Sequence, residues 1–131
     1  MEKKLILIVD DDEDLSRSLQ IILENQGFEV FAAQNKTEGF KLLEERKPDL
    51  ILLDIMMEST LEGYNMLHKI KNDENYKDIP VIMITGMADE LGVNFRAAVE
   101  DPDVLPGVIF MDKPVDQKEL LTEINNFLFK K

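Results

Sequence analysis

Five short apolar runs alternate with amphipathic stretches along the whole chain. A run without polar residues is typical of a parallel β-strand that is buried on both faces of a sheet. Parallel strands need right-handed crossovers, and the amphipathic stretches have the length and pattern of crossover helices. The alternation therefore predicts a doubly wound α/β fold, with strands at 5–9, 28–33, 50–53, 81–84 and 108–111.

The stretches between the apolar runs carry helix signals. Apolar residues recur at helical spacing from Leu15, and Gly27 lies where this first helix is expected to stop. Asp14 is expected to cap its start. The other predicted helices run from the capping pair Asn35 and Glu38 to about Arg46, from near Gly63 to Lys71, through 94–99, and onward from the pair Asp116 and Glu119.

Length and charge narrow the class of protein. A chain of 131 residues without an internal linker is expected to form one domain over 1–131. Its net charge of -12 disfavours binding to nucleic acid, and no apolar run approaches the roughly 20 residues that span a bilayer. There is no Cys and no secretory leader pattern, so we expect a cytoplasmic protein. For its oligomeric state we expect a monomer or weak dimer.

Polar side chains follow four of the apolar runs. Asp10 and Asp11 follow the first run, Asp54 the third, Thr85 the fourth and Lys113 the fifth. Because ligands of doubly wound sheets bind at the carboxyl ends of the strands, these groups are expected to meet at one edge. Clustered carboxylates without His or Cys favour a hard cation such as Mg²⁺. A lone strand-end carboxylate can act as a nucleophile toward phosphorus, with a hydroxyl and an ammonium group to bind the phosphoryl oxygens.

The motifs in this order resemble those of the receiver domain of two-component response regulators. They are residues 7–12 (LIVDDD), 49–57 (DLILLDIMM), 79–85 (IPVIMIT) and Lys113-Pro114, and the resemblance covers nearly the whole chain. It implies a five-stranded flavodoxin-like sheet of order 2-1-3-4-5 with five helices.

The resemblance also implies a role for each site residue. Asp54 would accept a phosphoryl group from a histidine kinase or histidine phosphotransfer protein, and Thr85 and Lys113 would bind the phosphoryl oxygens. Mg²⁺ would be held by Asp10, Asp11, Asp54 and the backbone carbonyl of Met56. Thr85 and Phe110 would form the switch that changes packing after phosphorylation. The protein would then be a signalling switch rather than an enzyme, with only its own phosphorylation and dephosphorylation as chemistry.

Two segments depart from the usual family pattern. Glu58 replaces a Pro in the loop after the acceptor, and 58–63 is about one residue longer than usual. The segment 86–107 before the fifth strand is longer as well. Since only 17 residues follow Pro114, the sequence favours a stand-alone receiver that docks to an output partner or relays phosphate.

Three other interpretations account for part of the pattern. A haloacid-dehalogenase-type phosphatase would explain Asp10-x-Asp12, but it leaves Asp54 without a role and lacks a second acidic pair after Lys113. An EF-hand is excluded because its required Gly and Glu positions hold Leu15 and Ile21. The third alternative is a receiver-fold interaction module that is never phosphorylated.

Overall fold

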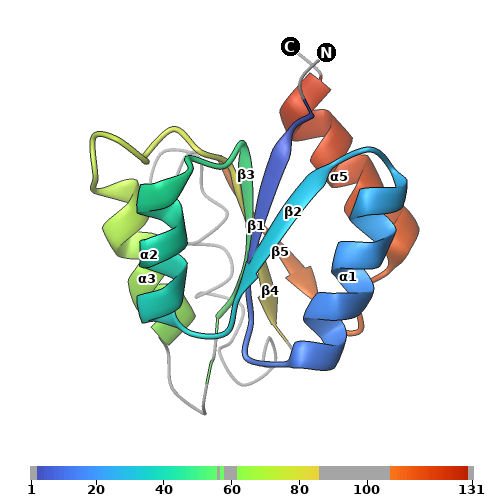
Figure 1. Ribbon diagram of the computed structural model, residues 1–131, viewed down its shortest axis with the longest axis horizontal. Coiled ribbons are helices and arrows are strands. Elements are labelled where there is room, and N and C mark those ends of the chain that lie inside the picture. The colour runs from blue at the N-terminus through green and yellow to red at the C-terminus, as the bar shows by residue number, and fades with distance from the viewer. Residues whose placement is uncertain (1–2, 56, 58–61, 86–106, 130–131) are drawn as a thin grey trace.

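The computed structural model describes residues 3–55, 57, 62–85 and 107–129 of the chain. Figure 1 shows a central sheet between two layers of helices. The elements in chain order are β1 (Leu5–Val9), α1 (Glu13–Asn25), β2 (Glu29–Ala33), α2 (Lys36–Glu45), β3 (Leu50–Asp54), α3 (Glu62–Lys71), β4 (Val81–Thr85), β5 (Val108–Asp112) and α5 (Gln117–Phe129).

The five strands form one parallel sheet with the order β2-β1-β3-β4-β5, which confirms the predicted doubly wound fold. Helices α1 and α5 cover one face of the sheet, and α2 and α3 cover the other (Figure 1). Four helices are therefore present in the described part of the chain. The helix predicted at 94–99 and the lengthened stretches 58–61 and 86–106 lie outside the described residues.

Each strand contributes side chains to two hydrophobic cores, one on each face of the sheet, which explains why the apolar runs are continuous. Leu7 and Val9 of β1 pack into the cluster beneath α2 and α3, whereas Ile6 and Ile8 pack into the cluster beneath α1 and α5. Successive side chains of a strand point to opposite faces, so a sheet covered on both sides needs apolar residues at every position. All five residues of β1 are buried.

Helix boundaries follow the predicted capping signals in three places. Gly27 ends the turn after α1 with a φ of 94°, a left-handed conformation that favours glycine. The Asn35 side chain accepts a hydrogen bond from the Glu38 backbone N–H at 2.8 Å. The Asp116 side chain accepts one from the Glu119 backbone N–H at 2.9 Å.

The predicted cap of the first helix is wrong by two residues, since α1 is capped by Asp12 rather than Asp14. The Oδ1 atom of Asp12 accepts a hydrogen bond from the Leu15 backbone N–H at 3.1 Å. The chain turns directly after β1, because the Asp12 N–H donates to Oδ1 of Asp10 at 2.9 Å. Asp14 therefore lies inside the first turn of the helix, where a negative charge remains favourable.

Three strands extend one residue beyond the prediction, into a polar residue. Asp54 still pairs with Ile84 in the sheet, and Thr85 pairs with Asp112. The pairing of the backbone continues after the apolar side chains end. The site residues of β3 and β4 consequently belong to the sheet rather than to loops.

No helix in the described ranges combines the length and apolarity required to cross a bilayer.

Ser16 supplies a prediction about the packing of α1. Its side chain is 6% exposed, and its hydroxyl finds no hydrogen-bond partner among the described residues. Ser16→Ala is expected to raise the free energy of unfolding by about 1 kcal/mol, because it removes an unpaired hydroxyl and improves helix propensity. Urea denaturation measures this change. Ser18→Ala, at an exposed position of the same helix, controls for propensity alone, and an equal gain in both variants would contradict the explanation.

Candidate functional site

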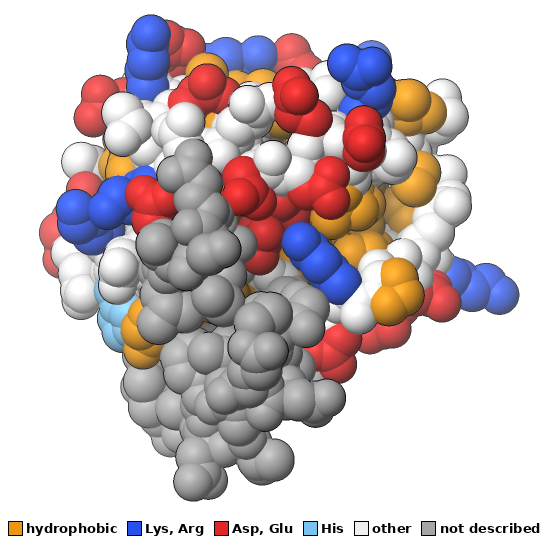
Figure 2. Space-filling view, turned by 90° about the horizontal axis from the view of Figure 1, so that it is seen from below, with side chains coloured by type: hydrophobic (Ala, Val, Ile, Leu, Met, Phe, Trp, Pro, Cys, Tyr) orange, Lys and Arg blue, Asp and Glu red, His pale blue; other side chains and the backbone are white. Residues whose placement is uncertain are grey.

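Three carboxylates meet at the carboxyl edge of the sheet. Asp10 and Asp11 follow β1 and Asp54 ends the neighbouring strand β3, and one oxygen of each lies within 4.8 Å of the others. Figure 2, which views this edge, shows acidic side chains gathered beside a basic one at the centre of the face. The structure therefore brings together the three carboxylates that the sequence predicted would meet at this edge.

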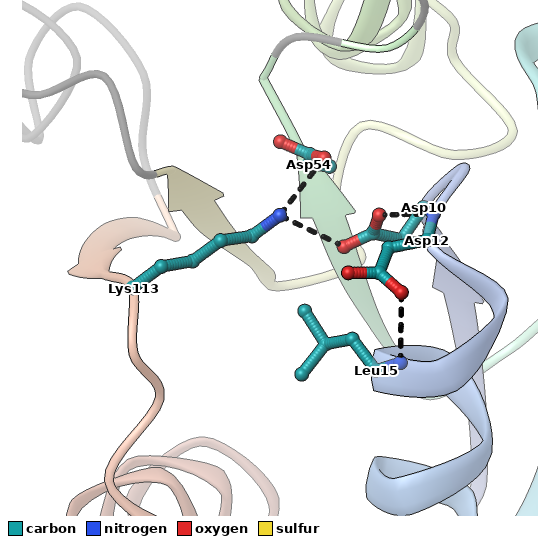
Figure 3. A network of polar contacts seen from close by, with 5 residues as sticks. All are labelled: Asp10, Asp12, Leu15, Asp54 and Lys113. Atoms are coloured by element: carbon teal, nitrogen blue, oxygen red, sulfur yellow. Dashed lines mark hydrogen bonds and ion pairs between the residues drawn. The ribbon is translucent and has the colours of Figure 1, made fainter.

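The members of the cluster differ in exposure. Asp10 is 2% exposed and Asp54 is 5% exposed, whereas Asp11 is open to solvent. Asp10 uses Oδ1 to accept the turn hydrogen bond from the Asp12 N–H, which fixes the orientation of its carboxylate (Figure 3). The Asp12 carboxylate turns to α1 as its cap and is not part of the cluster. Two carboxylates are thus buried, and the third is accessible from outside.

Lys113 reaches this cluster from the loop after β5. Its Nζ atom lies 3.2 Å from Oδ2 of Asp54 and 3.5 Å from Oδ2 of Asp10 (Figure 3). The sheet order separates β5 from β3 by one strand, and the long lysine side chain spans that gap. Lys113 therefore neutralises part of the charge of both buried carboxylates. The sequence predicted that Lys113 would be near, but not that it bridges Asp10 and Asp54.

The electrostatics of the site favour a proton on Asp54 more strongly than in water. Burial, followed by the negative charge of Asp10, raises the pKa of Asp54 to about 7, although Lys113 opposes the shift. Burial also disfavours the ammonium form of Lys113, but the charges of Asp10 and Asp54 outweigh it and raise the pKa of Lys113. Lys113 is consequently charged near neutral pH, while the Asp54 carboxylate is held in a site with too little positive charge.

Gly63 positions the end of β3 against α3, a role that the sequence alone did not reveal. The first turn of α3 packs against the end of β3 so closely that a Cβ on Gly63 would overlap the backbone oxygen of Asp54. The Tyr64 N–H donates to the carbonyl of Ile55 at 3.2 Å, which ties the helix to the same segment. Only a residue without a side chain allows this approach. A glycine in the first turn of a predicted helix was the available signal.

The other predicted site residues are placed as follows. Thr85 ends β4, the strand next to Asp54 in the sheet. Phe110 lies in β5, pairs with Met83 and is 5% exposed in the core under α2 and α3. Met56 lies outside the described residues, so the predicted carbonyl ligand has no structural account.

The donor set of the cluster fits Mg²⁺. All three side chains offer carboxylate oxygens, which are the ligands that hard divalent cations prefer, and one of them is open to solvent. Burial and then the charge of Asp10 raise the pKa of Asp54 even with Lys113 in place, so additional positive charge would favour its ionised form. A divalent cation beside Asp10, Asp11 and Asp54 would supply that charge.

Magnesium is expected to stabilise the folded chain. At a concentration about tenfold above its dissociation constant, an ion that binds only the folded state adds about 1.4 kcal/mol, which raises the melting temperature by about 4 °C. Thermal denaturation with and without MgCl₂ measures the shift. Asp11→Asn removes the exposed ligand without burying a new group, and it should reduce the shift. An equal shift in both proteins would place the ion elsewhere.

Comparison with known proteins gives consistent similarities. The family model described as response regulator receiver domain matches residues 6–125. The chain is 40% identical to the phosphate regulon transcriptional regulatory protein PhoB of Pseudomonas aeruginosa over 98% of this chain and 53% of that protein. It is 34% identical to protein PilH of the same species, over 94% of this chain and 96% of PilH.

Similarity extends to solved structures. A CheY-like response regulator receiver domain protein from Methanospirillum hungatei is 31% identical and superposes with a TM-score of 0.79, covering 95% of this chain and 93% of that one. The chain spans about half the length of PhoB and of two relatives from Synechocystis, the master transcriptional regulator RpaA and the response regulator Rre1.

Proposed function

Because the chain belongs to the family of response regulator receiver domains, we propose that it is a phosphorylation-dependent switch of a two-component system in which Asp54 is the phosphoacceptor. The observation that carries the proposal is the position of Asp54. It ends β3 beside Asp10, where the ammonium group of Lys113 contacts both carboxylates, at the carboxyl edge of a doubly wound sheet. The signalling role itself follows from the family.

The proposed reaction is a transfer between a phosphohistidine of the donor and Asp54. A carboxylate oxygen of Asp54 attacks phosphorus, and the bond from phosphorus to the histidine nitrogen breaks with its electron pair left on the ring. Lys113, already 3.2 Å from the attacking carboxylate, offsets charge on the phosphoryl oxygens. Asp10 and Asp11 would hold Mg²⁺ together with Asp54, and the ion would neutralise charge and help to orient the phosphoryl group.

Phosphorylation would be read out through β4 and β5. We assign Thr85 as a ligand of the phosphoryl oxygens, because it ends the strand beside Asp54. Phe110 lies on the next strand, β5, where it pairs with Met83 of β4 and is part of the core. A movement of Thr85 toward the phosphoryl group would shift the population between two packings of Phe110, and a partner would bind the altered surface.

Lys113→Ala is expected to leave the chain folded and to abolish the response to phosphorylation. The ammonium group contacts the acceptor carboxylate, so its loss uncouples the phosphoryl group from β5. Amide NMR spectra with and without beryllofluoride, a phosphoryl analogue, measure the response across β4 and β5. Lys118→Ala, at an exposed position of α5, is the matched control. An unaltered response in Lys113→Ala would show that another residue couples the two.

The proposed donors are a histidine kinase or a histidine phosphotransfer protein in the cytoplasm, where ATP-dependent kinases act. The proposed output is docking to a partner protein or further relay of the phosphoryl group, with the chain as a monomer or weak dimer. Its own chemistry would be limited to gaining and losing this phosphoryl group. Neither nucleic acid nor membrane is a proposed direct partner, since the net charge is -12.

The test is intact mass after incubation with acetyl phosphate and Mg²⁺. Wild type is expected to gain one phosphoryl group, and Asp54→Asn is expected to gain none. If neither protein gains mass, a beryllofluoride titration distinguishes a receiver that requires its kinase from an interaction module that is not phosphorylated. Equal gain in both proteins would contradict the assignment of Asp54.

A further inference from the structure

A second candidate site lies at the opposite edge of the sheet from the acidic cluster. A cavity of about 560 Å³ opens between the residues before β1, the turn from α1 to β2, and α5. Its apolar walls are Phe28, Leu121 and Phe129. This volume is in the range of ligand-binding clefts. Figure 1 shows the start of β1 and the end of α5 together at this edge.

The apolar wall includes one exposed aromatic side chain, that of Phe129. Phe129 keeps 59% of its surface exposed although its ring stacks on the buried Phe28, with centroids 6.3 Å apart. Among the described residues, Ile21 on α1 is the other large apolar side chain with comparable exposure. An apolar side chain that entered the cavity would therefore bury area on the exposed Phe129 ring, and burial of apolar surface favours binding.

The charge of the cavity is opposite to that of the chain. The protein carries 27 Asp and Glu against 15 Lys and Arg, yet the charged side chains that line the cavity are Lys3 and Lys4. Arg46 lowers the pKa of nearby Glu29 through a bidentate ion pair of 2.7 and 3.0 Å, and Lys3 lowers it further. The carboxylate of Glu29, which interacts electrostatically with Lys3, is thus already paired with Arg46.

Two side-chain amides complete the lining. Gln26, which caps α1, and Asn125 of α5 each offer a carbonyl oxygen and an NH₂ group. This pair of functions matches the N–H and C=O groups of a peptide backbone. An acidic peptide would find a partner for each of its groups in this cavity. Its carboxylates would face the lysines, its backbone the amides, and its apolar side chain the aromatic walls.

We propose that this cavity binds an acidic peptide segment of a partner protein, with an apolar side chain against Phe28 and Phe129 and carboxylates beside Lys3 and Lys4. Opposite charge across such an interface adds specificity and accelerates association. The inference does not rest on phosphorylation of Asp54, since the site lies at the other end of the strands. A partner bound there leaves the acidic cluster accessible.

The test uses the full ¹⁵N-labelled chain and an end-blocked hexapeptide with Phe-Leu at its centre and two Glu on each side. We expect its addition to shift amide resonances of residues 3–4, 26–28 and 121–129, with weaker binding at higher salt. A hexapeptide with Lys in place of every Glu should not shift them. The double variant Lys3→Glu/Lys4→Glu is expected to weaken binding about tenfold, equivalent to about 1.4 kcal/mol.

The matched control is Lys41→Glu/Lys118→Glu, which changes the net charge equally at two exposed positions outside the cavity. It should bind the acidic peptide more tightly than Lys3→Glu/Lys4→Glu does. Equal weakening in the two double variants would show an effect of net charge alone and overturn the proposal. Equal amide shifts with the acidic and the basic peptide would also overturn it. So would a result in which 3-phenylpropionate, a small aromatic carboxylate, binds to the cavity and the acidic peptide does not. Phosphorylation of Asp54 is measured separately, so either proposal can fail alone.

Discussion

Gly63→Ala is expected to lower the free energy of unfolding by about 3 kcal/mol or more, a large effect for a single added methyl group. The added Cβ would overlap the backbone oxygen of Asp54 and lie 2.6 Å from its carbonyl carbon and 2.8 Å from the oxygen of Ile55. These atoms belong to the backbone at the end of β3, so relief requires that the strand end or α3 move. The gain of about 1 kcal/mol from replacing a helical Gly is too small to compensate.

Gly39→Ala is the matched control, because Gly39 is also a buried glycine within a helix. Its added Cβ would lie 2.9 Å from Cε of Met66 and 3.3 Å from Cγ2 of Val9. The end of a methionine side chain can move at little cost. Urea denaturation of both variants measures the difference. A loss in Gly63→Ala no larger than in Gly39→Ala would show that α3 does not press on the end of β3.

Asp54→Asn is expected to act in the opposite direction and stabilise the metal-free chain by about 2 kcal/mol at pH 8. The pKa of Asp54 is raised to about 7, chiefly by burial and then by Asp10. A buried carboxylate that is ionised above this pH costs free energy that a neutral amide of the same shape avoids. The amide oxygen of the variant can still accept from Lys113, which retains its ion pair with Asp10.

The same shift fixes the pH dependence of that difference. Because the pKa of Asp54 in the folded chain, about 7, lies above its ordinary value of about 4, the folded state binds more protons between these limits. The free energy of unfolding of wild type therefore falls as pH rises from about 4 to about 7 through this group. The advantage of Asp54→Asn should be near zero at pH 4 and complete above pH 7.

Urea denaturation at pH 4, 6 and 8 without divalent cations measures this effect. Asp14→Asn, which removes an exposed carboxylate from the first turn of α1, controls for net charge and is expected to lose slight stability. A constant difference between wild type and Asp54→Asn across the pH range would show that ionisation of the buried carboxylate is not the cause. A loss of stability in Asp54→Asn at pH 8 would show the same.

Much of the fold was predictable because its main signal is carried by every strand. A sheet covered on both faces requires apolar residues at consecutive positions, and the runs Leu5–Val9 and Val81–Thr85 show this pattern with no more than a terminal polar residue. The strand-end residues could be grouped for the same reason, since parallel strands bring their carboxyl ends to one edge. Asp10, Asp11, Asp54 and Lys113 meet there.

The features that sequence did not predict depend on distances between segments. Five consecutive acidic residues offer several possible caps, and the choice of Asp12 over Asp14 depends on how tightly the chain turns after β1. The role of Gly63 depends on how closely α3 approaches β3, which no local pattern encodes. The two contacts of Lys113 depend on the gap across β4. These are tertiary distances, and a local pattern holds no information on them.

The residue that carries the phosphoryl group can be identified by reduction of the phosphorylated chain with borohydride, which converts an aspartyl phosphate to homoserine. Peptide mass mapping then locates the homoserine. Asp54 is expected to be the modified residue, because it lies beside Lys113 at the end of β3 and is flanked by Asp10. Homoserine at position 54 and at no other Asp would support the proposed function. Homoserine at Asp10, Asp11 or Asp12, in a chain that has gained one phosphoryl group, would contradict it.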